Sequence, residues 1–434
     1  MDIPFTRHEL DNGLRVVIHE DHRLPLAAVN VWYHVVSKNE RPGRTGFAHL
    51  FEHLMFEGSE HYDRGYFHPL QEAGALLNGS TSVDRTNYWE IVPTNALDLA
   101  LWMESDRMGY LLPALTTEKF ENQRDVVLNE RRQNYENRPY GLATMAVVGA
   151  LFPPEHPYHW PTIGAPADLE AATFEEVRAF FQAHYVPSNA SLVVAGDIAP
   201  GDAIERVRKY FDEIPPGPGP SPVSSRAAID SEVRLTLENR VELPRLYLAW
   251  HSPALFSPGD AEMDLLADLV GAGKVSRLYR ALVYERRLAT EVVAVQNSHE
   301  LSGFWQIVAT AAPGHSLEEL EGAINDELSR LIEAGPTAGE LARGQAQVEA
   351  HFIYRLQTLG GFGGKSDQLN GYNVFLNDPG YFERDLARYQ RVTLPQLHEA
   401  ARRYLPRSGR VTLSVVPEGR RSLAVPGSIP AVVS

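Results

Sequence analysis

The sequence predicts an α+β protein built from two copies of one domain. Strand-like and helical runs alternate through all 434 residues, as they do in α+β domains. A proline- and glycine-rich stretch over residues 214–222 divides the chain near its midpoint, and proline keeps such a stretch extended. We therefore expect a first domain over residues 1–214, a linker over residues 215–230 and a homologous domain over residues 231–434.

The repeat is clearest towards the end of each half. Thr173 begins a helical run that leads to a Tyr-Val-Pro sequence and then to a strand at residues 191–195. Thr393 begins a similar run that leads to Tyr-Leu-Pro and a strand at residues 411–416. The offset between corresponding residues is nearly constant, at about 220, so the two halves look like a diverged duplication.

Each half also opens with two strand-like runs, and amphipathic helical runs follow. Strands are expected at residues 14–19, 27–36, 78–89, 234–237, 245–250 and 302–308, where β-branched and aromatic residues are frequent or polar and apolar residues alternate. Helices are expected at residues 47–56, 96–111, 260–271 and 317–334, where apolar residues recur at helical spacing.

Composition excludes several classes of protein. A formal net charge of −16 argues against general nucleic-acid binding. The chain has no cysteine, which excludes disulfides and thiolate catalysis. No apolar run approaches the ~18 residues of a membrane span, and the N-terminus carries no signal sequence, although a chain trimmed to its mature start would look the same. We expect a soluble protein, periplasmic or cytoplasmic.

The most informative segment is His49-Leu50-Phe51-Glu52-His53. Residues at i, i+3 and i+4 share one face of a helix, so His49, Glu52 and His53 would project together. Two imidazoles one turn apart can bind one metal ion, while the carboxylate reaches the water bound to it. H-x-x-E-H is the inverted zincin motif. The alternative is a solvated helix face, since chance produces the pattern in roughly one chain of this length in twenty to thirty.

The surroundings of the motif favour a helix. The loop over residues 42–46 ends in Thr45, the expected N-cap, and Gly58 can terminate the helix. Apolar residues recur at helical spacing at Phe47, Leu50, Phe51, Leu54 and Met55. The polar motif residues interrupt this apolar stretch, and a bound metal would satisfy them.

A catalytic zinc usually has three protein ligands, so one more must come from elsewhere in the chain. A helical stripe in residues 117–130 consists of Phe120, Gln123, Val127 and Glu130. Glu130 therefore lies on an inward face that is otherwise largely apolar. A surface ion pair with Arg131 or Arg132 is the alternative, and the pattern alone slightly favours it over metal ligation.

With this candidate in place, the chain resembles the pitrilysin-type (M16) zinc peptidases, and in particular their half-length members. In that family H-x-x-E-H is followed some seventy residues later by a third ligand, a glutamate, and Glu130 stands at that distance from His53. Other family-like stretches are residues 10–17, 56–58, 78–82, 86–88 and 127–132. The resemblance covers nearly the whole chain.

The resemblance implies zinc on His49, His53 and Glu130, with Glu52 as the general base of an endopeptidase acting on peptides or unfolded segments in an enclosed chamber. It also implies two domains, each an antiparallel-rich sheet packed by helices, that form half of a clamshell. The second half lacks the motif and would be non-catalytic. One departure is Gln123, because many members carry a second glutamate there; an amide can hydrogen-bond but cannot ligate or accept a proton.

The resemblance also points to a substrate-binding strand. In the family, an edge strand equivalent to residues 78–89 pairs with the substrate backbone. The small polar residues Asn78, Ser80, Thr81 and Ser82 favour this role over that of an ordinary core strand. The glycine-rich residues 359–365 resemble a substrate-guiding loop of the family, although a flexible connector explains them equally well.

A partner subunit is expected as well, since the chain has about half the length of single-chain family members. Active relatives hold the substrate carbonyl with an arginine and a tyrosine from the second half of the clamshell. A rough alignment places Trp305 and Ser316 at those positions, although a small shift would change the match and Tyr279 or Arg280 could substitute. We therefore expect the zinc subunit of a heterodimer, with a homodimer as the alternative.

A second hypothesis for function is a non-catalytic assembly subunit, like the core proteins of respiratory complexes, which resemble this fold. Those proteins have typically lost the metal residues. This chain has kept all four: His49, Glu52, His53 and Glu130.

Overall fold

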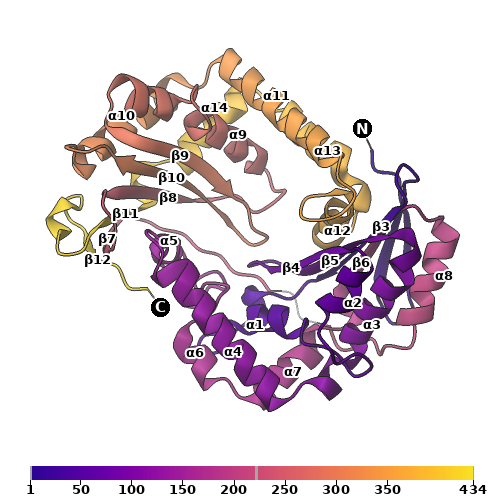
Figure 1. Ribbon diagram of the computed structural model, residues 1–434. Helices are drawn as coiled ribbons and strands as arrows, with labels where there is room; N and C mark the ends of the chain where they lie inside the picture. The colour runs from indigo at the N-terminus through magenta and orange to yellow at the C-terminus, as the bar shows by residue number, and fades with distance from the viewer. Residues whose placement is uncertain (1, 220–222, 434) are drawn as a thin grey trace. The chain divides into compact units, whose positions relative to one another are not determined.

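The computed structural model describes residues 2–219 and 223–433. It contains two six-stranded mixed sheets with helices packed on them (Figure 1). The predicted α+β class with two related domains is therefore confirmed. Of the expected linker over residues 215–230, residues 220–222 lie outside the described residues.

The first sheet has the strand order β1-β2-β6-β3-β5-β4. Neighbouring strands are antiparallel except β2 and β6, which are parallel. Its strands are β1 (Thr6–Glu9), β2 (Arg15–Glu20), β3 (Leu26–Tyr33), β4 (Leu76–Thr81), β5 (Thr86–Pro93) and β6 (Ala190–Gly196).

The second sheet has the order β12-β7-β11-β8-β10-β9, and β11 and β12 both pair with β7 in parallel. Its strands are β7 (Val233–Asn239), β8 (Arg245–Ser252), β9 (Ala289–Asn297), β10 (Gly303–Ala311), β11 (Arg410–Pro417) and β12 (Ile429–Pro430). Taken in chain order, five strands of this sheet occupy the same positions as β2 to β6 of the first, as a duplication requires.

The helices that lead into the central strands repeat too. α7 (Phe174–His184) precedes β6, and α14 (Leu394–Tyr404) precedes β11. Both begin with a capping box, in which Thr173 pairs with Glu176 and Thr393 pairs with Gln396. The similar sequences at Thr173 and Thr393 that indicated the repeat therefore form the same helix cap in each copy.

The expected helices at residues 260–271 and 317–334 are α9 (Asp260–Gly271) and α10 (Leu317–Ala334). The run at residues 96–111 corresponds to α3 (Leu97–Ala114), which begins one residue later. The remaining helices are α1 (Phe47–Leu54), α2 (Phe67–Glu72), α4 (Thr117–Arg131), α5 (Ala143–Leu151), α6 (Pro166–Ala171), α8 (Pro200–Phe211), α11 (Ala338–Arg355), α12 (Lys365–Leu376) and α13 (Phe382–Gln390).

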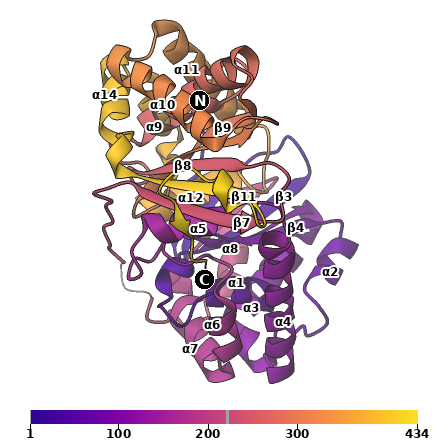
Figure 2. The same ribbon diagram turned by 90° about the vertical axis from the view of Figure 1, so that its left-hand side faces the viewer.

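The contacts between residues divide the chain into two compact units, and each unit contains segments from both halves of the sequence. The first contains residues 1–129, 161–223 and 351–384, and the second contains residues 130–160, 224–350 and 385–434. In the first unit, α3 packs on one face of β3 and β5 while α12 packs on β3 and β6. In the second unit, α9, α10 and α14 pack on the sheet while α5 packs on β8 and β11 (Figure 2).

Side-chain alternation places α12 on the face of the first sheet opposite α3. Asn30 of β3 accepts hydrogen bonds from the Asn370 amide of α12, at 2.7 and 2.9 Å, whereas its neighbour Val31 is buried on the other face. Each sheet thus carries a helix from the other half of the sequence. The division into domains at residues 1–214 and 231–434 stays a prediction.

The segment at residues 78–89 is a hairpin, and the prediction of a single strand there was wrong. β4 ends at Thr81 and β5 begins at Thr86. The Ser82 hydroxyl accepts the backbone N–H groups of Asp84, at 3.2 Å, and Arg85, at 3.1 Å. Serine hydroxyls commonly close turns in this way, and alternation continues on both sides of the turn, which hid it.

Helices long and apolar enough to cross a membrane do not occur among residues 2–219 and 223–433.

Candidate metal centre

Helix α1 presents one polar face and buries all its other residues. Phe47, Ala48, Leu50, Phe51 and Leu54 are buried. His49, Glu52 and His53 are half-buried, and the two imidazole centroids lie 4.9 Å apart. The expected common face of the motif is therefore present in the structure.

The N-terminus of α1 is capped by a distant residue. The Glu40 carboxylate accepts the backbone N–H groups of Gly46, at 2.9 Å, and Ala48, at 2.8 Å. The expectation that Thr45 is the N-cap was wrong, because the Thr45 hydroxyl instead donates to Asp168 at 2.7 Å. Gly46 has φ +90°, and a Cβ there would lie 2.9 Å from Leu169, so glycine is required at this turn.

Glu40 is a half-buried acid. Burial raises the pKa of Glu40 to about 8, although the amide donors of α1 act in the opposite direction. No sequence pattern signals a glutamate six residues before the cap position, so sequence reasoning missed it.

Aromatic residues hold α1 from the opposite side. Phe51 stacks on Phe180 of α7, with ring centroids 6.0 Å apart. The hydroxyls of Tyr88 and Tyr185 donate to the α1 carbonyls of Phe51 and Ala48, each at 3.4 Å. The helix is thus fixed by packing and by hydrogen bonds to its backbone, which leaves the motif face as its accessible side.

Glu130 reaches this face from the last turn of α4. His49, His53 and Glu130 each offer one ligand atom, and these atoms all lie within 4.8 Å of one another. Within residues 2–219 and 223–433, no other group of three His, Asp or Glu residues is placed to hold a metal. The structure therefore brings together the three residues that the sequence predicted as ligands.

A π-helical turn over Arg132–Glu136 continues α4 beyond Glu130. From this turn the Asn134 amide donates to Oε1 of Glu130 at 3.2 Å. Such turns occur frequently at functional sites, and hydrogen bonds of this kind orient carboxylate ligands. Arg131, one of the alternative ion-pair partners of Glu130, forms an ion pair with Glu136 at 3.0 Å.

This donor set fits zinc. A tetrahedral zinc ion with bonds of about 2.1 Å holds its ligand atoms about 3.4 Å apart. Atoms already within 4.8 Å of one another can reach that geometry by small side-chain rotations. Two imidazoles and one carboxylate leave a fourth position for water, as catalytic zinc sites do.

A pocket of about 350 Å³ adjoins Glu52 and His53. Its other lining residues are Phe56, Glu57, Phe67 and Gln123. The rings of Phe56 and Phe67 lie 4.6 Å apart, and the Gln123 amide donates to Glu57 at 2.5 Å. Sequence reasoning identified Gln123 as a departure from the family. It gave Glu57 only as part of a family-like stretch, without a role in the site, and it missed Phe67.

Comparison with known sequences agrees with this geometry. Residues 15–153 match the family described as insulinase (peptidase family M16), and residues 171–348 match the peptidase M16 inactive domain. The chain belongs to the M16 peptidase family. The motif-bearing half matches the first description, and the match to the inactive domain includes most of the half that lacks the motif.

Individual M16 relatives have low sequence identity to this chain but match it over most of its length. The zinc protease PqqE of Helicobacter pylori is 29% identical over 361 residues, which are 81% of this chain and 81% of that protein. A probable mitochondrial-processing peptidase subunit beta of Arabidopsis thaliana is 25% identical over 342 residues, covering 74% of this chain and 62% of that protein. The crystal structure of a protease from Helicobacter pylori superimposes with a TM-score of 0.86 at 26% identity, over 96% of this chain and all of that chain.

The predicted substrate-binding residues lie on and beside β4, one of the two edge strands of the first sheet. Asn78 is exposed there. The Ser80 hydroxyl donates to Asn87 of β5 at 2.6 Å, and Ser82 closes the hairpin turn. Thr81, the last residue of β4, is half-buried. The two serine side chains therefore stabilise the hairpin, and a substrate role for these residues stays a prediction.

The residues aligned with the family's arginine and tyrosine are structural. Trp305 is fully buried in β10, and its indole N–H donates to the Met263 carbonyl at 3.1 Å. The Ser316 hydroxyl accepts the Glu319 N–H at 3.1 Å and caps α10. Of the possible substitutes, Arg280 forms an ion pair with Glu285 at 3.6 Å, and Tyr279 packs against the hydrophobic core of the second unit.

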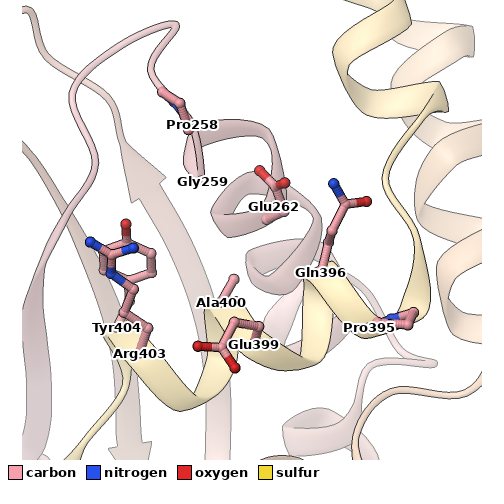
Figure 3. Close-up of a pocket in the computed structure, with 9 residues that line it drawn as sticks. All are labelled: Pro258, Gly259, Glu262, Pro395, Gln396, Glu399, Ala400, Arg403 and Tyr404. Atoms are coloured by element: carbon pink, nitrogen blue, oxygen red, sulfur yellow. The ribbon is translucent and has the colours of Figure 1, made fainter.

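A second pocket of about 350 Å³ lies in the second unit, between the start of α9 and α14 (Figure 3). Its lining residues are Pro258, Gly259, Glu262, Pro395, Gln396, Glu399, Ala400, Arg403 and Tyr404. The Arg403 guanidinium lies over the Tyr404 ring, 5.2 Å from its centroid. No histidine lines this pocket, so it lacks the donor set found on α1 and α4.

The raised pKa of the Glu40 cap gives a prediction about pH. Unfolded Glu40 ionises near pH 4.5, whereas folded Glu40 keeps its proton up to about pH 8. The folded state therefore binds the extra proton, and its stability should fall as pH rises between these values. In zinc-free buffer, wild type should lose roughly 3 kcal/mol of unfolding free energy relative to Glu40→Gln between pH 5 and pH 8, measured by urea denaturation. If wild type instead gains stability relative to Glu40→Gln as pH rises, the Glu40 carboxyl is ionised in the folded protein.

Proposed function

We propose that this M16 chain is a zinc-dependent endopeptidase that hydrolyses peptides or unfolded segments. The observation that carries the proposal is the convergence of His49, His53 and Glu130, with Glu52 on the same helix face. Several relatives, including PqqE, are named zinc proteases, which supports the same chemistry. The general test is the zinc content of the purified chain together with peptide cleavage with and without a chelator.

The chain's own residues would divide the work as follows. His49, His53 and Glu130 would hold the metal, and Asn134 would orient the Glu130 carboxylate. When bound, a zinc ion supplies Lewis-acid activation of water and of the peptide carbonyl. Glu52 would accept the proton of the attacking water on its carboxylate and then donate it to the leaving amine nitrogen.

Substrate would bind in an extended form along β4. An edge strand presents unpaired backbone groups with which a peptide can pair, and β4 is the last strand of its sheet. We assign the recognition chiefly to the main chain of residues 78–82. Asn78 would face the substrate, while Ser80, Thr81 and Ser82 would keep the hairpin in the geometry that the pairing needs.

The alternative is a non-catalytic assembly subunit. Retention of His49, Glu52, His53 and Glu130 in one cluster favours the enzyme, because an assembly role does not require a metal-binding donor set. Chelator-sensitive cleavage distinguishes the two functions.

We also propose that a homologous half-length subunit completes the active enzyme. Trp305 and Ser316 are engaged in core packing and helix capping, so neither is a donor for the substrate carbonyl. One relative carries the name of a subunit, the beta subunit of a processing peptidase. A heterodimer whose partner supplies arginine and tyrosine is our preferred arrangement, and a homodimer is the alternative.

Removal of the base should separate chemistry from metal binding. Glu52→Gln should lower kcat by about 10²- to 10⁴-fold, the range for loss of a general base. Its zinc content should stay at the wild-type level because the ligands are unchanged. Peptide cleavage and metal analysis on the same preparation provide the measurement, and near wild-type turnover would exclude Glu52 as the base.

Removal of the third ligand should affect the metal itself. Glu130→Gln should weaken zinc binding by roughly 100-fold or more, since even residues that only orient a ligand contribute about 10- to 100-fold. Gln123→Ala should weaken it far less. Glu121→Gln, an exposed change on the same helix, is the matched control. Competition with a fluorescent chelator measures each affinity, and equal losses for residues 123 and 130 would overturn the ligand assignment.

The partner proposal predicts a difference between the isolated and the paired chain. The purified chain alone should bind zinc yet cleave peptides poorly. Adding the homologous subunit from the same source should raise kcat/KM by roughly 100-fold, the effect of restoring oxyanion donors. Full activity of this chain alone, with a monomer or homodimer mass by light scattering, would contradict the heterodimer.

A further inference from the structure

The pocket that Glu52 lines combines aromatic walls with a second acidic group, Glu57. Phe56 and Phe67 lie nearly parallel, with an interplanar angle of 31°. Glu57 lines the same pocket, and no lysine or arginine of the described residues forms an ion pair with it. The volume of about 350 Å³ lies within the range of ligand pockets, roughly 300 to 1,000 Å³. The pocket can therefore hold one long side chain.

Gln123 explains how Glu57 is held in place. A carboxylate only accepts hydrogen bonds, so the Gln123 amide must present its N–H to Glu57. A glutamate at position 123 would set two carboxylates side by side, and they would repel each other. The amide, which departs from the family pattern, thus belongs to a pair that fixes one negative charge in the pocket.

We propose that this pocket receives the side chain of a substrate residue next to the scissile bond, and that the Glu57–Gln123 pair selects lysine or arginine there. The inference rests on the proposed function, since Glu52 and His53 form another part of the pocket lining. The aliphatic stem of the basic residue packs against Phe56 and Phe67, and its cation meets the Glu57 carboxylate. An acidic side chain is repelled by Glu52 and Glu57 together.

The test uses sets of peptides that differ only at one residue next to the scissile bond. In each set, that residue is arginine, methionine or glutamate. The enzyme, with its partner if one is required, should show a kcat/KM about 5-fold higher for arginine than for methionine, as a partly solvated charge pair provides. Glu57→Gln should abolish this ratio, and Glu57→Lys should favour glutamate. Glu60→Gln, an exposed change three residues away, should keep the wild-type ratio.

A second measurement does not depend on turnover. Binding of the same peptides to zinc-loaded Glu52→Gln, and to the double variant with Glu57→Gln, is followed by fluorescence anisotropy. The arginine peptide should bind the first variant about 5-fold more tightly than the methionine peptide. The two peptides should bind the double variant equally well. Zinc content and melting temperature show that each variant is folded.

The two hypotheses fail in different ways. If no preparation shows chelator-sensitive cleavage, the proposed function is wrong. If cleavage or binding occurs but Glu57→Gln leaves the arginine-to-methionine ratio unchanged, the pocket assignment is wrong.

Discussion

Three half-buried polar side chains on an otherwise buried helix are the constraint on which the first unit depends. Burying imidazole or carboxylate groups is unfavourable unless they are paired. Helix α1 therefore has to sit at a fixed depth and rotation, so that His49, Glu52 and His53 face Glu130 while five apolar residues pack inward. The Glu40 cap, the Phe51–Phe180 stack and the hydroxyls of two tyrosines all act on the position of this helix.

In both copies of the duplicated domain, a side chain of the sheet donates a hydrogen bond to a helix carbonyl. Tyr88 lies on β5 and Trp305 on β10, which occupy corresponding positions in the two sheets. The first donates to a carbonyl of α1, which follows β3, and the second donates to a carbonyl of α9, which follows β8. On α9 the polar Asp264 meets the Tyr389 hydroxyl at 2.6 Å, and burial raises the pKa of Asp264 to about 7. The second copy thus pairs its polar helix residue with a tyrosine, whereas the first places two histidines of its helix near Glu130.

The features that could be predicted from the sequence are those that depend on local periodicity. The polar face of α1, the stripe that carries Glu130 and the bounds of α9 all follow from helical spacing. The Glu40 cap, the pairing of Gln123 with Glu57 and the packing of α12 on the first sheet depend on residues far apart in the chain, for which one sequence gives no signal. The hairpin at Ser82 was missed because a four-residue turn preserves strand alternation on both sides.

The packing of α12 has a consequence for how the chain is made. Asn370 and Asn373 of this helix donate to Ser191 of β6 from a fully buried position, and Asn370 also donates to Asn30 of β3. During synthesis, β3 and β6 leave the ribosome long before residues 365–376 exist. Contacts of such long sequence separation form slowly, because a large loop must close first. The first sheet would therefore emerge with one face uncovered, and its final assembly would wait for the other half of the chain.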